Sequence, residues 1–300
     1  MLSREVFERL IAKIDCELGE TEINFHQRPL HAFSKLTQQV DPKGTFFMKS
    51  DCDISQDDYS NDALCTQVHQ WYEKRYGDRV KIHLGPGSYI LMIKNEPWEV
   101  VYPLCYGQNN FTIDSNLTQK DREHITESGK SIPSVNILCH VENMTFDMAN
   151  SLSPIEKQAI LSDYMFGLNA VQSLRSIERA PFMEQAANDY DVSVSNIFHK
   201  YPDYNNSKWA TLQFAEKSMK SQLQLNDVKF GFNHDLSGLA KSLKSIGINI
   251  PQQIIDNIQC KPAVRYGEIK VTRNEAVLSV KSALALFSDV FSASAYSYES

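Results

Sequence analysis

The first 76 residues show two stretches in which apolar side chains recur at helical spacing. One runs from Ser3 to about Leu18 and the other covers residues 61–76, where Gly77 ends the pattern. The stretch between them is polar, and residues 41–44 (Asp-Pro-Lys-Gly) indicate a turn. We therefore predict two helices joined by an irregular connection.

Alternating apolar and polar residues follow, and this pattern is typical of strands. The predicted strands, separated by turns that contain Gly or Pro, cover residues 79–84, 88–94 and 98–104. Strands so close together favour a small antiparallel meander. Residues 107–135 are polar without a period and predict a surface loop, whereas residues 136–141 predict one more short strand.

From Ser153 onward the pattern is helical only. Ser153, Pro154 and Glu156 predict a helix start, as an N-cap serine, a first-turn proline and a capping-box glutamate. Residues 178–206 are mixed and predict no clear helix. Further apolar stripes predict helices near residues 209–223, after an N-cap at Asn233, from Pro251, and from a second capping box at Thr272 and Glu275.

These patterns predict an α+β protein of two domains. We expect a small α+β domain over residues 1–145 and an all-α helical bundle over residues 146–300. The last helix is apolar on more than one face, through Val277, Leu278, Val280, Ala283, Leu284, Leu286, Phe287, Val290 and Phe291. Such a helix must bury a second face, so we predict a twofold homodimer through the helical half, with the N-terminal domain as the alternative cover.

The helical half contains four short motifs in order. They are Ala210 with Ala215-Glu216-Lys217 and Lys220, then His234-Asp235-Leu236, then Arg265-Tyr266, and finally Ala276. Together they resemble the HEPN family of helical domains, over roughly residues 150–295. The resemblance implies a HEPN-like bundle that self-associates in a prokaryotic defence or toxin–antitoxin-like setting. It also implies a candidate functional surface made of Glu216, Lys217, Lys220, His234, Asp235, Arg265 and Tyr266.

HEPN proteins that cleave RNA carry an arginine and a histidine separated by four to six residues, and this chain departs from that pattern. The last histidine is His234, so neither Arg265 nor Arg273 has a histidine after it. Arg28 and His31 are too close together and lie in the predicted irregular stretch. Because RNA cleavage needs a group that titrates near neutral pH, we predict no catalytic residue and no cleavage.

The expected function is therefore a non-catalytic HEPN-like interaction and dimerisation role, with a further protein as a second partner. One alternative is an RNA-binding or RNA-processing protein with a diverged HEPN site. Another is a degenerate nucleotidyltransferase fused to the HEPN-like half, with Asp51 and Asp53 as weak candidates for metal ligands. Gly44 lies closer to Asp51 than that family requires, so we predict no metal site and no cofactor.

Charge, hydropathy and cysteine spacing indicate which partners and which cellular compartment to expect. The formal net charge is −7, whereas proteins that bind nucleic acid usually carry a basic surplus, so RNA is not the favoured partner. No apolar run is long enough to span a membrane, and the charged amphipathic start is unlike a signal peptide. The six cysteines are scattered without a Cys-x-x-Cys pair, which is typical of reduced thiols. We therefore expect a cytoplasmic protein.

Overall fold

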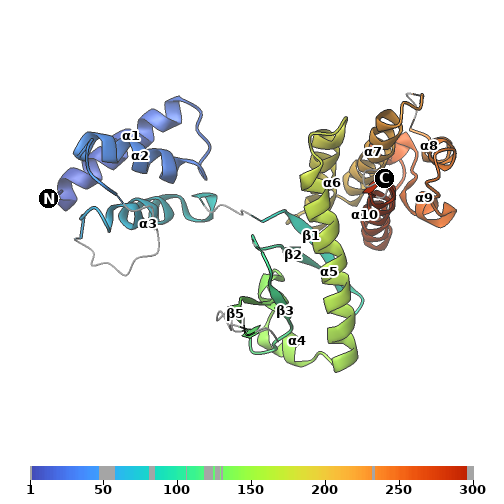
Figure 1. Cartoon of the computed structure of the whole chain (residues 1–300), viewed down its shortest axis with the longest axis horizontal. Coiled ribbons are helices and arrows are strands. Elements are labelled where there is room, and N and C mark those ends of the chain that lie inside the picture. Colours follow the sequence, from blue (N-terminus) through green and yellow to red (C-terminus); the bar gives the residue numbers. More distant parts are fainter. Residues whose placement is uncertain are drawn as a thin grey trace. The chain divides into compact units, whose positions relative to one another are not determined.

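The chain divides into two compact units, Met1–His83 and Leu84–Ser300 (Figure 1). The computed structural model describes residues 2–46, 58–80, 85–105, 107–117, 124–125, 129, 131–231 and 234–295. About 59% of the chain is helical and the strands are short, so the protein is of mixed α+β class. Along the sequence, the boundary between the two units lies between residues 83 and 84, well before the predicted boundary between residues 145 and 146.

The Met1–His83 unit is a helical domain with its own core. Its elements are α1 (Arg4–Glu20), α2 (Arg28–Val40), α3 (Leu64–Tyr76) and the 3-10 turn η1 (Gly77–Val80). α1 begins where the sequence predicts, because the Ser3 hydroxyl accepts a hydrogen bond from the Val6 N–H. The core consists of buried side chains from all three helices, among them Phe7, Ile11, Ile14, Leu36, Leu64, Val68 and Tyr72.

The predicted irregular stretch contains α2, so that interpretation is wrong. Arg28 begins this helix instead of lying in a loop. The side chains that α2 buries are Pro29, Ala32, Phe33 and Leu36. Their spacing of i, i+3, i+4 and i+7 defines one helix face. Pro29 stands in the first turn, where its missing N–H costs no helical hydrogen bond.

The first strand of the predicted meander is also absent from the described residues. Gly77, with φ of 57°, ends α3, and the backbone continues as η1 to Val80. Residues 79 and 80 are therefore part of a 3-10 turn rather than a strand. Residues 81–84 lie outside the described part of the chain.

The other two predicted strands form a hairpin in the Leu84–Ser300 unit. β1 (Ser88–Ile93) pairs antiparallel with β2 (Glu96–Val101). Lys94 and Asn95 make the turn between them, with φ angles of 51° and 64°. Two consecutive positive φ angles give the tight turn that suits the natural twist of a hairpin.

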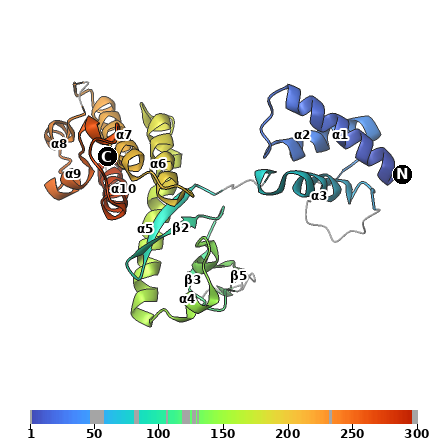
Figure 2. The ribbon, with the colours of Figure 1, turned by 180° about the vertical axis from the view of Figure 1, so that it is seen from behind.

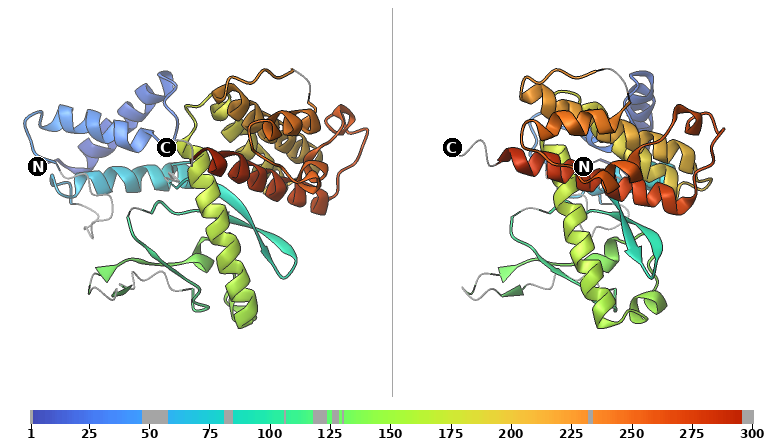
Figure 3. Two further views of the ribbon diagram at one scale, coloured as in Figure 1. Left: turned by 45° about the vertical axis from the view of Figure 1, so that its right-hand side comes forward. Right: turned by 90° about the vertical axis from the view of Figure 1, so that its right-hand side faces the viewer.

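The hairpin packs on the helix α5 (Pro154–Ser176), as Figure 3 shows. The rings of Tyr89 and Tyr102 lie against Gly167, where the absent side chain leaves room for them. The Tyr102 hydroxyl donates a hydrogen bond to the Tyr164 carbonyl at 3.0 Å. The hairpin and the helices share one hydrophobic core, and this is why the unit boundary precedes β1.

A partly buried ion pair joins β1 to two long helices. Lys281 of α10 (Arg273–Ala295) donates to both carboxylate oxygens of Asp163 in α5, at 2.7 and 2.8 Å. Lys281 also donates to the Tyr89 hydroxyl at 2.8 Å, and that hydroxyl donates to Asp163 at 2.6 Å. Burial lowers the pKa of the Lys281 ammonium, and the charge of Asp163 offsets this effect.

Short strands interrupt the predicted surface loop. They form a parallel pair, β3 (Asn110–Thr112) with β6 (Ser134–Asn136), and an antiparallel pair, β4 (His124–Ile125) with β5 (Ser131–Ile132). The strand predicted at residues 136–141 is mostly a 3-10 turn, η2 (Ile137–His140). The Asn136 side chain caps this turn by accepting a hydrogen bond from the Leu138 N–H.

The remaining helices, apart from α4, are arranged around α7. The full set is α4 (Phe146–Asn150), α6 (Met183–Phe198), α7 (Tyr204–Leu225), α8 (Leu236–Lys244) and α9 (Gln252–Ile258), with the 3-10 turn η3 (Pro262–Val264) before α10. Both α6 and α10 run along α7, and α8 and α9 pack beside α7 and α10 (Figure 2). The helix α6 lies in residues 178–206, where the sequence predicted no clear helix.

The last helix buries most of its apolar side chains inside its own unit. Leu284, Leu286 and Phe287 are fully buried where α10 packs against α5, α6, α7 and α9. Leu278 is 52% exposed, and Phe291 is partly buried. Because most of these side chains are already covered, the apolar pattern of α10 no longer argues for a dimer.

Candidate functional site

One face of α7 carries a buried ion pair. Glu216 and Lys220 are four residues apart on the helix and only 5% and 8% exposed. The Lys220 ammonium donates a hydrogen bond to Glu216 Oε1 at 2.5 Å. A buried carboxylate is costly unless charged or donor groups surround it, so Glu216 needs a partner for its second oxygen as well.

His234 supplies that second partner from the segment before α8. Its Nδ1 lies 2.6 Å from Glu216 Oε2, and its side chain is 47% exposed. The backbone is also held, since Gln259 Nε2 donates to the His234 carbonyl at 3.0 Å while Gln259 Oε1 accepts from the Leu236 N–H at 3.0 Å. The imidazole is thus fixed at the surface by a buried carboxylate.

An aromatic ring and a guanidinium lie beside this imidazole. The Trp209 ring stands nearly edge-on to His234, with 5.5 Å between ring centroids and 70° between planes. Arg265 Cζ lies 5.8 Å from the centroid of the Trp209 ring. Gln213 Nε2 lies 3.3 Å from His234 Nδ1. We call Trp209, Gln213, Glu216, His234 and Arg265 the His234 site.

A second aromatic group borders the buried pair. The Lys220 ammonium lies 5.8 Å from the centroid of the Phe230 ring, which meets Phe182 edge to face at 6.1 Å. Phe182 precedes α6 with φ of 65°, a left-handed conformation that costs a non-glycine residue about 1–3 kcal/mol. The turn between α5 and α6 is therefore held next to Lys220 by aromatic packing.

The structure brings together Glu216, Lys220 and His234. Arg265 contacts the Trp209 ring, which in turn contacts the imidazole of His234. Lys217 instead forms an ion pair with Asp189 of α6. Burial raises the pKa of the Asp189 carboxyl, and the hydrogen bond from Lys217 offsets part of that rise.

The remaining two candidates lie outside this cluster of contacts. Asp235, rather than Asn233, is the N-cap residue of α8, although its side chain makes no capping hydrogen bond. His234 and Asp235 therefore do not act as a pair, because the carboxylate that binds the imidazole belongs to Glu216. Tyr266 is 72% exposed.

Sequence reasoning missed Trp209, Gln213 and Gln259. It assigned Trp209 to the apolar stripe of α7, but this side chain is only partly buried. A usable signal was present, because residues 209, 213, 216 and 220 follow one another at intervals of four, three and four along a single helix face. Gln259 is a contact between distant segments and has no such signal.

The chemistry of the His234 site suits binding. Among the described residues, His234 Nε2 has no hydrogen-bond partner, so this nitrogen is the one that a ligand can reach. The Arg265 guanidinium suits phosphate oxygens, and the Trp209 ring suits a nucleic-acid base.

Asp51 and Asp53, the candidate metal ligands, lie outside the described residues, as does Asn233. Within the described ranges, no group of three or more His, Cys, Asp or Glu side chains is placed to hold a metal ion. Of the helices that the structure describes, none is both long and apolar enough to cross a membrane. Comparison with known proteins gives no match to a family model, a curated protein or a solved structure.

Proposed function

We propose that the Leu84–Ser300 unit binds single-stranded RNA at the His234 site. The observation that carries the proposal is the meeting of an indole, a guanidinium and a fixed imidazole, contributed by three separate segments of the chain. An aromatic ring offers stacking to any base, the guanidinium donates to phosphate, and the imidazole donates to phosphate through Nε2 when it is protonated. The resemblance to the HEPN family, whose active members act on RNA, supports the same ligand class.

The negative net charge of the chain determines how strongly this binding should depend on salt. With a formal net charge of −7, the protein offers no general attraction to phosphates, so few contacts carry the affinity. One or two phosphate contacts from Arg265 and His234 correspond to a slope of roughly −0.7 to −1.4 in a plot of log binding constant against log salt. A much steeper slope would place the RNA on a broad basic surface instead.

Fluorescence anisotropy with a labelled single-stranded RNA oligonucleotide tests the proposal. Trp209→Ala removes a stacking surface worth about 1–3 kcal/mol per base, which weakens binding roughly 5- to 150-fold. Arg265→Ala should weaken binding and flatten the salt dependence. Lys241→Ala removes an exposed cation of α8 outside the site and serves as the matched control. Equal affinity of Trp209→Ala and wild type would refute RNA binding at this site.

We further propose that the bound RNA is not cut. Incubation of the protein with mixed tRNA and mRNA at neutral pH should leave the RNA intact, because the helical half lacks the arginine and histidine separated by four to six residues that RNA-cleaving HEPN proteins carry. Cleavage that disappears in His234→Ala would show that the site is catalytic. A chain that binds no RNA but forms dimers in light scattering would instead favour the HEPN-like interaction role.

A further inference from the structure

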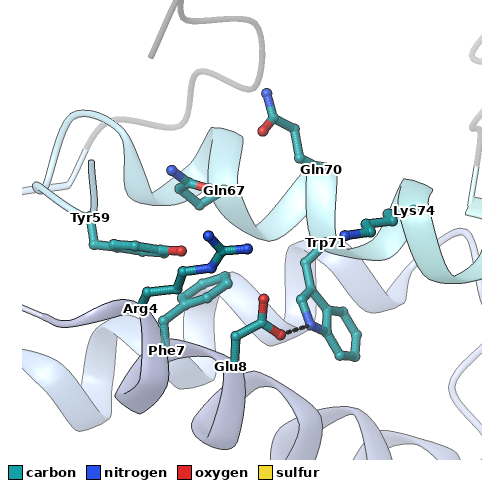
Figure 4. Close-up of a pocket in the computed structure, with 8 residues that line it drawn as sticks. All are labelled: Arg4, Phe7, Glu8, Tyr59, Gln67, Gln70, Trp71 and Lys74. Carbon is teal, nitrogen blue, oxygen red and sulfur yellow. Dashed lines mark hydrogen bonds between the residues drawn. The ribbon is translucent and has the colours of Figure 1, made fainter. Parts of the chain in front are cut away.

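The cavity between α1 and α3 in the Met1–His83 unit is crossed by one of its own lining side chains. Its volume is about 200 Å³, and Figure 4 shows the Arg4 guanidinium between Tyr59 and Trp71. The space between these two rings is therefore not open to a flat ligand. In the other unit, by contrast, His234 Nε2 has no hydrogen-bond partner among the described residues.

The contact with Glu216 determines which nitrogen of His234 carries the proton. Nδ1 lies 2.6 Å from Glu216 Oε2, and the other oxygen of the same carboxylate accepts from the Lys220 ammonium at 2.5 Å. A carboxylate can only accept hydrogen bonds, so Nδ1 must donate to it. In a neutral imidazole, a proton on Nδ1 leaves Nε2 with a free electron pair. Nε2 of the neutral ring is therefore an acceptor.

The Gln213 amide does not compete for this proton. Its Nε2 lies 3.3 Å from His234 Nδ1, which is farther than the 2.6 Å contact with the Glu216 carboxylate. Hydrogen bonds to an ionised acceptor are both shorter and stronger than those between neutral groups. The amide oxygen and nitrogen of a glutamine can also exchange places by rotation, so Gln213 adapts to a proton on Nδ1.

An acceptor at Nε2 selects a donor on the nucleic acid. Ionised phosphate oxygens have no proton to donate, whereas the ribose 2′-hydroxyl does. The Trp209 ring, on which a base would stack, lies 5.5 Å from the imidazole between ring centroids, and Arg265, which suits phosphate, contacts the same ring. The ribose joins the base to the phosphate, so it is the part of the nucleotide that comes next to the imidazole.

We propose that His234 Nε2 accepts a hydrogen bond from the 2′-hydroxyl of the bound nucleotide and so distinguishes RNA from DNA. This inference rests on the proposed binding of RNA at the His234 site. Glu216 fixes the ring and Gln259 holds the His234 carbonyl at 3.0 Å, so the acceptor stands in a defined position. The preference belongs to the neutral imidazole, because a protonated ring donates from Nε2.

Anisotropy titrations of the full chain with three single-stranded oligoadenylates test the inference, at about pH 8, where an ordinary imidazole is neutral. The oligonucleotides differ only at the 2′ position, which carries a hydroxyl, a hydrogen or a fluorine. Fluorine keeps the sugar shape of RNA but donates no hydrogen bond. The deoxy and fluoro forms should both bind roughly 2- to 12-fold more weakly than RNA, because each lacks one hydrogen bond. Equal affinity for the hydroxyl and fluoro forms would overturn the inference.

Two variants act on the acceptor in different ways. His234→Ala removes it and should bind all three oligonucleotides equally. In Glu216→Gln, the amide oxygen accepts from Lys220 while the amide nitrogen donates to Nδ1, so the proton moves to Nε2 and the preference for RNA should disappear with His234 still present. Lys241→Ala changes an exposed cation outside the site and should keep the preference of the wild type. A preference for RNA that survives in His234→Ala would show that another group reads the sugar.

Failure of the proposed function has a different signature. In that case Trp209→Ala would bind all three oligonucleotides as the wild type does. If Trp209→Ala weakens binding but the wild type binds the hydroxyl, deoxy and fluoro forms equally, the site binds nucleic acid without reading the sugar. Only the inference about His234 would then be wrong.

Discussion

A single glycine controls how closely the hairpin approaches α5. A Cβ atom on Gly167 would lie 2.3 Å from the Tyr102 hydroxyl and 2.6 Å from the Tyr89 ring. Neither ring has room to withdraw, since both tyrosines are 1% exposed and Tyr102 is hydrogen-bonded to Tyr164. We predict that Gly167→Ala lowers the free energy of unfolding by about 1–3 kcal/mol, measured by urea denaturation.

Gly238 offers the matched control for this residue-scale prediction. A Cβ at that position would meet the carboxylate of Asp235, the end of an exposed side chain that can move aside. Alanine is also the better helix former, so Gly238→Ala should be neutral or stabilising by up to about 1 kcal/mol. If Gly167→Ala unfolds at the same urea concentration as wild type, the hairpin does not rest on this glycine.

At the scale of elements, the capping box of α10 couples its stability to pH. The Thr272 hydroxyl accepts from the Glu275 N–H at 3.3 Å, and the Glu275 carboxylate accepts from the Thr272 N–H at 2.8 Å. That backbone hydrogen bond, and a second one that the Thr272 hydroxyl donates to the same carboxylate at 2.7 Å, hold the pKa of the Glu275 carboxyl below its ordinary value. Alanine at position 272 keeps the first of these bonds and removes the second. A carboxyl with a lowered folded-state pKa stabilises the fold above its unfolded-state pKa, and that contribution is lost as pH falls through the folded-state pKa.

Thr272→Ala should therefore cost about 1 kcal/mol of unfolding free energy near neutral pH, and less below about pH 4. Thermal unfolding of both proteins across this pH range measures the difference. Asn274→Ala changes an exposed neighbour outside the box and should show no such trend. A Thr272→Ala deficit that stays constant with pH would mean that the Glu275 carboxylate does not act through Thr272.

Elements with explicit start signals were predicted well from the sequence. Ser3, Ser153 and Thr272 precede α1, α5 and α10, because an N-cap hydroxyl acts locally and leaves a local pattern. The helices α2 and α6 were missed, and their N-cap residues, Gln27 and Phe182, make no side-chain cap that would mark a helix start.

Glu216, Lys220, His234 and Arg265 were all proposed from the family resemblance. Glu216 and Lys220 are also four residues apart, which places them on one helix face. The bond from His234 to Glu216 joins residues 18 positions apart through the segment between two helices, and no local pattern encodes that geometry. Packing between segments also hid the unit boundary, because the contact of β1 with α5 has no sequence signal.

At the scale of the whole molecule, the division at residues 83 and 84 predicts which fragments fold. Residues 2–80 and 85–300 each retain a complete core, so each should unfold cooperatively by itself. Residues 146–300 lack the hairpin and would expose the face of α5 that Tyr89 and Tyr102 cover. We predict a lower melting temperature and stronger binding of a hydrophobic dye for this fragment than for residues 85–300.

Calorimetry and dye fluorescence on the three fragments provide the measurement. The fragment of residues 85–300 serves as the control, because it contains the same helices together with the hairpin. If the fragment of residues 146–300 melts at the same temperature as residues 85–300, the result supports the domain boundary that was predicted from the sequence.

The contact of Lys281 with Tyr89 bears on how the chain folds while it is being synthesised. These residues are 192 positions apart, so the hairpin and α5 leave the ribosome long before the helix that supplies the lysine. The core of the Met1–His83 unit is built from its own described residues, so this unit can fold early, but the second unit must wait for α10. A copy that terminates before α10 leaves Asp163 without its cation and α7 without one of its neighbours. Incomplete copies of the protein therefore cannot close this core, and their exposed apolar surfaces mark them for aggregation or degradation.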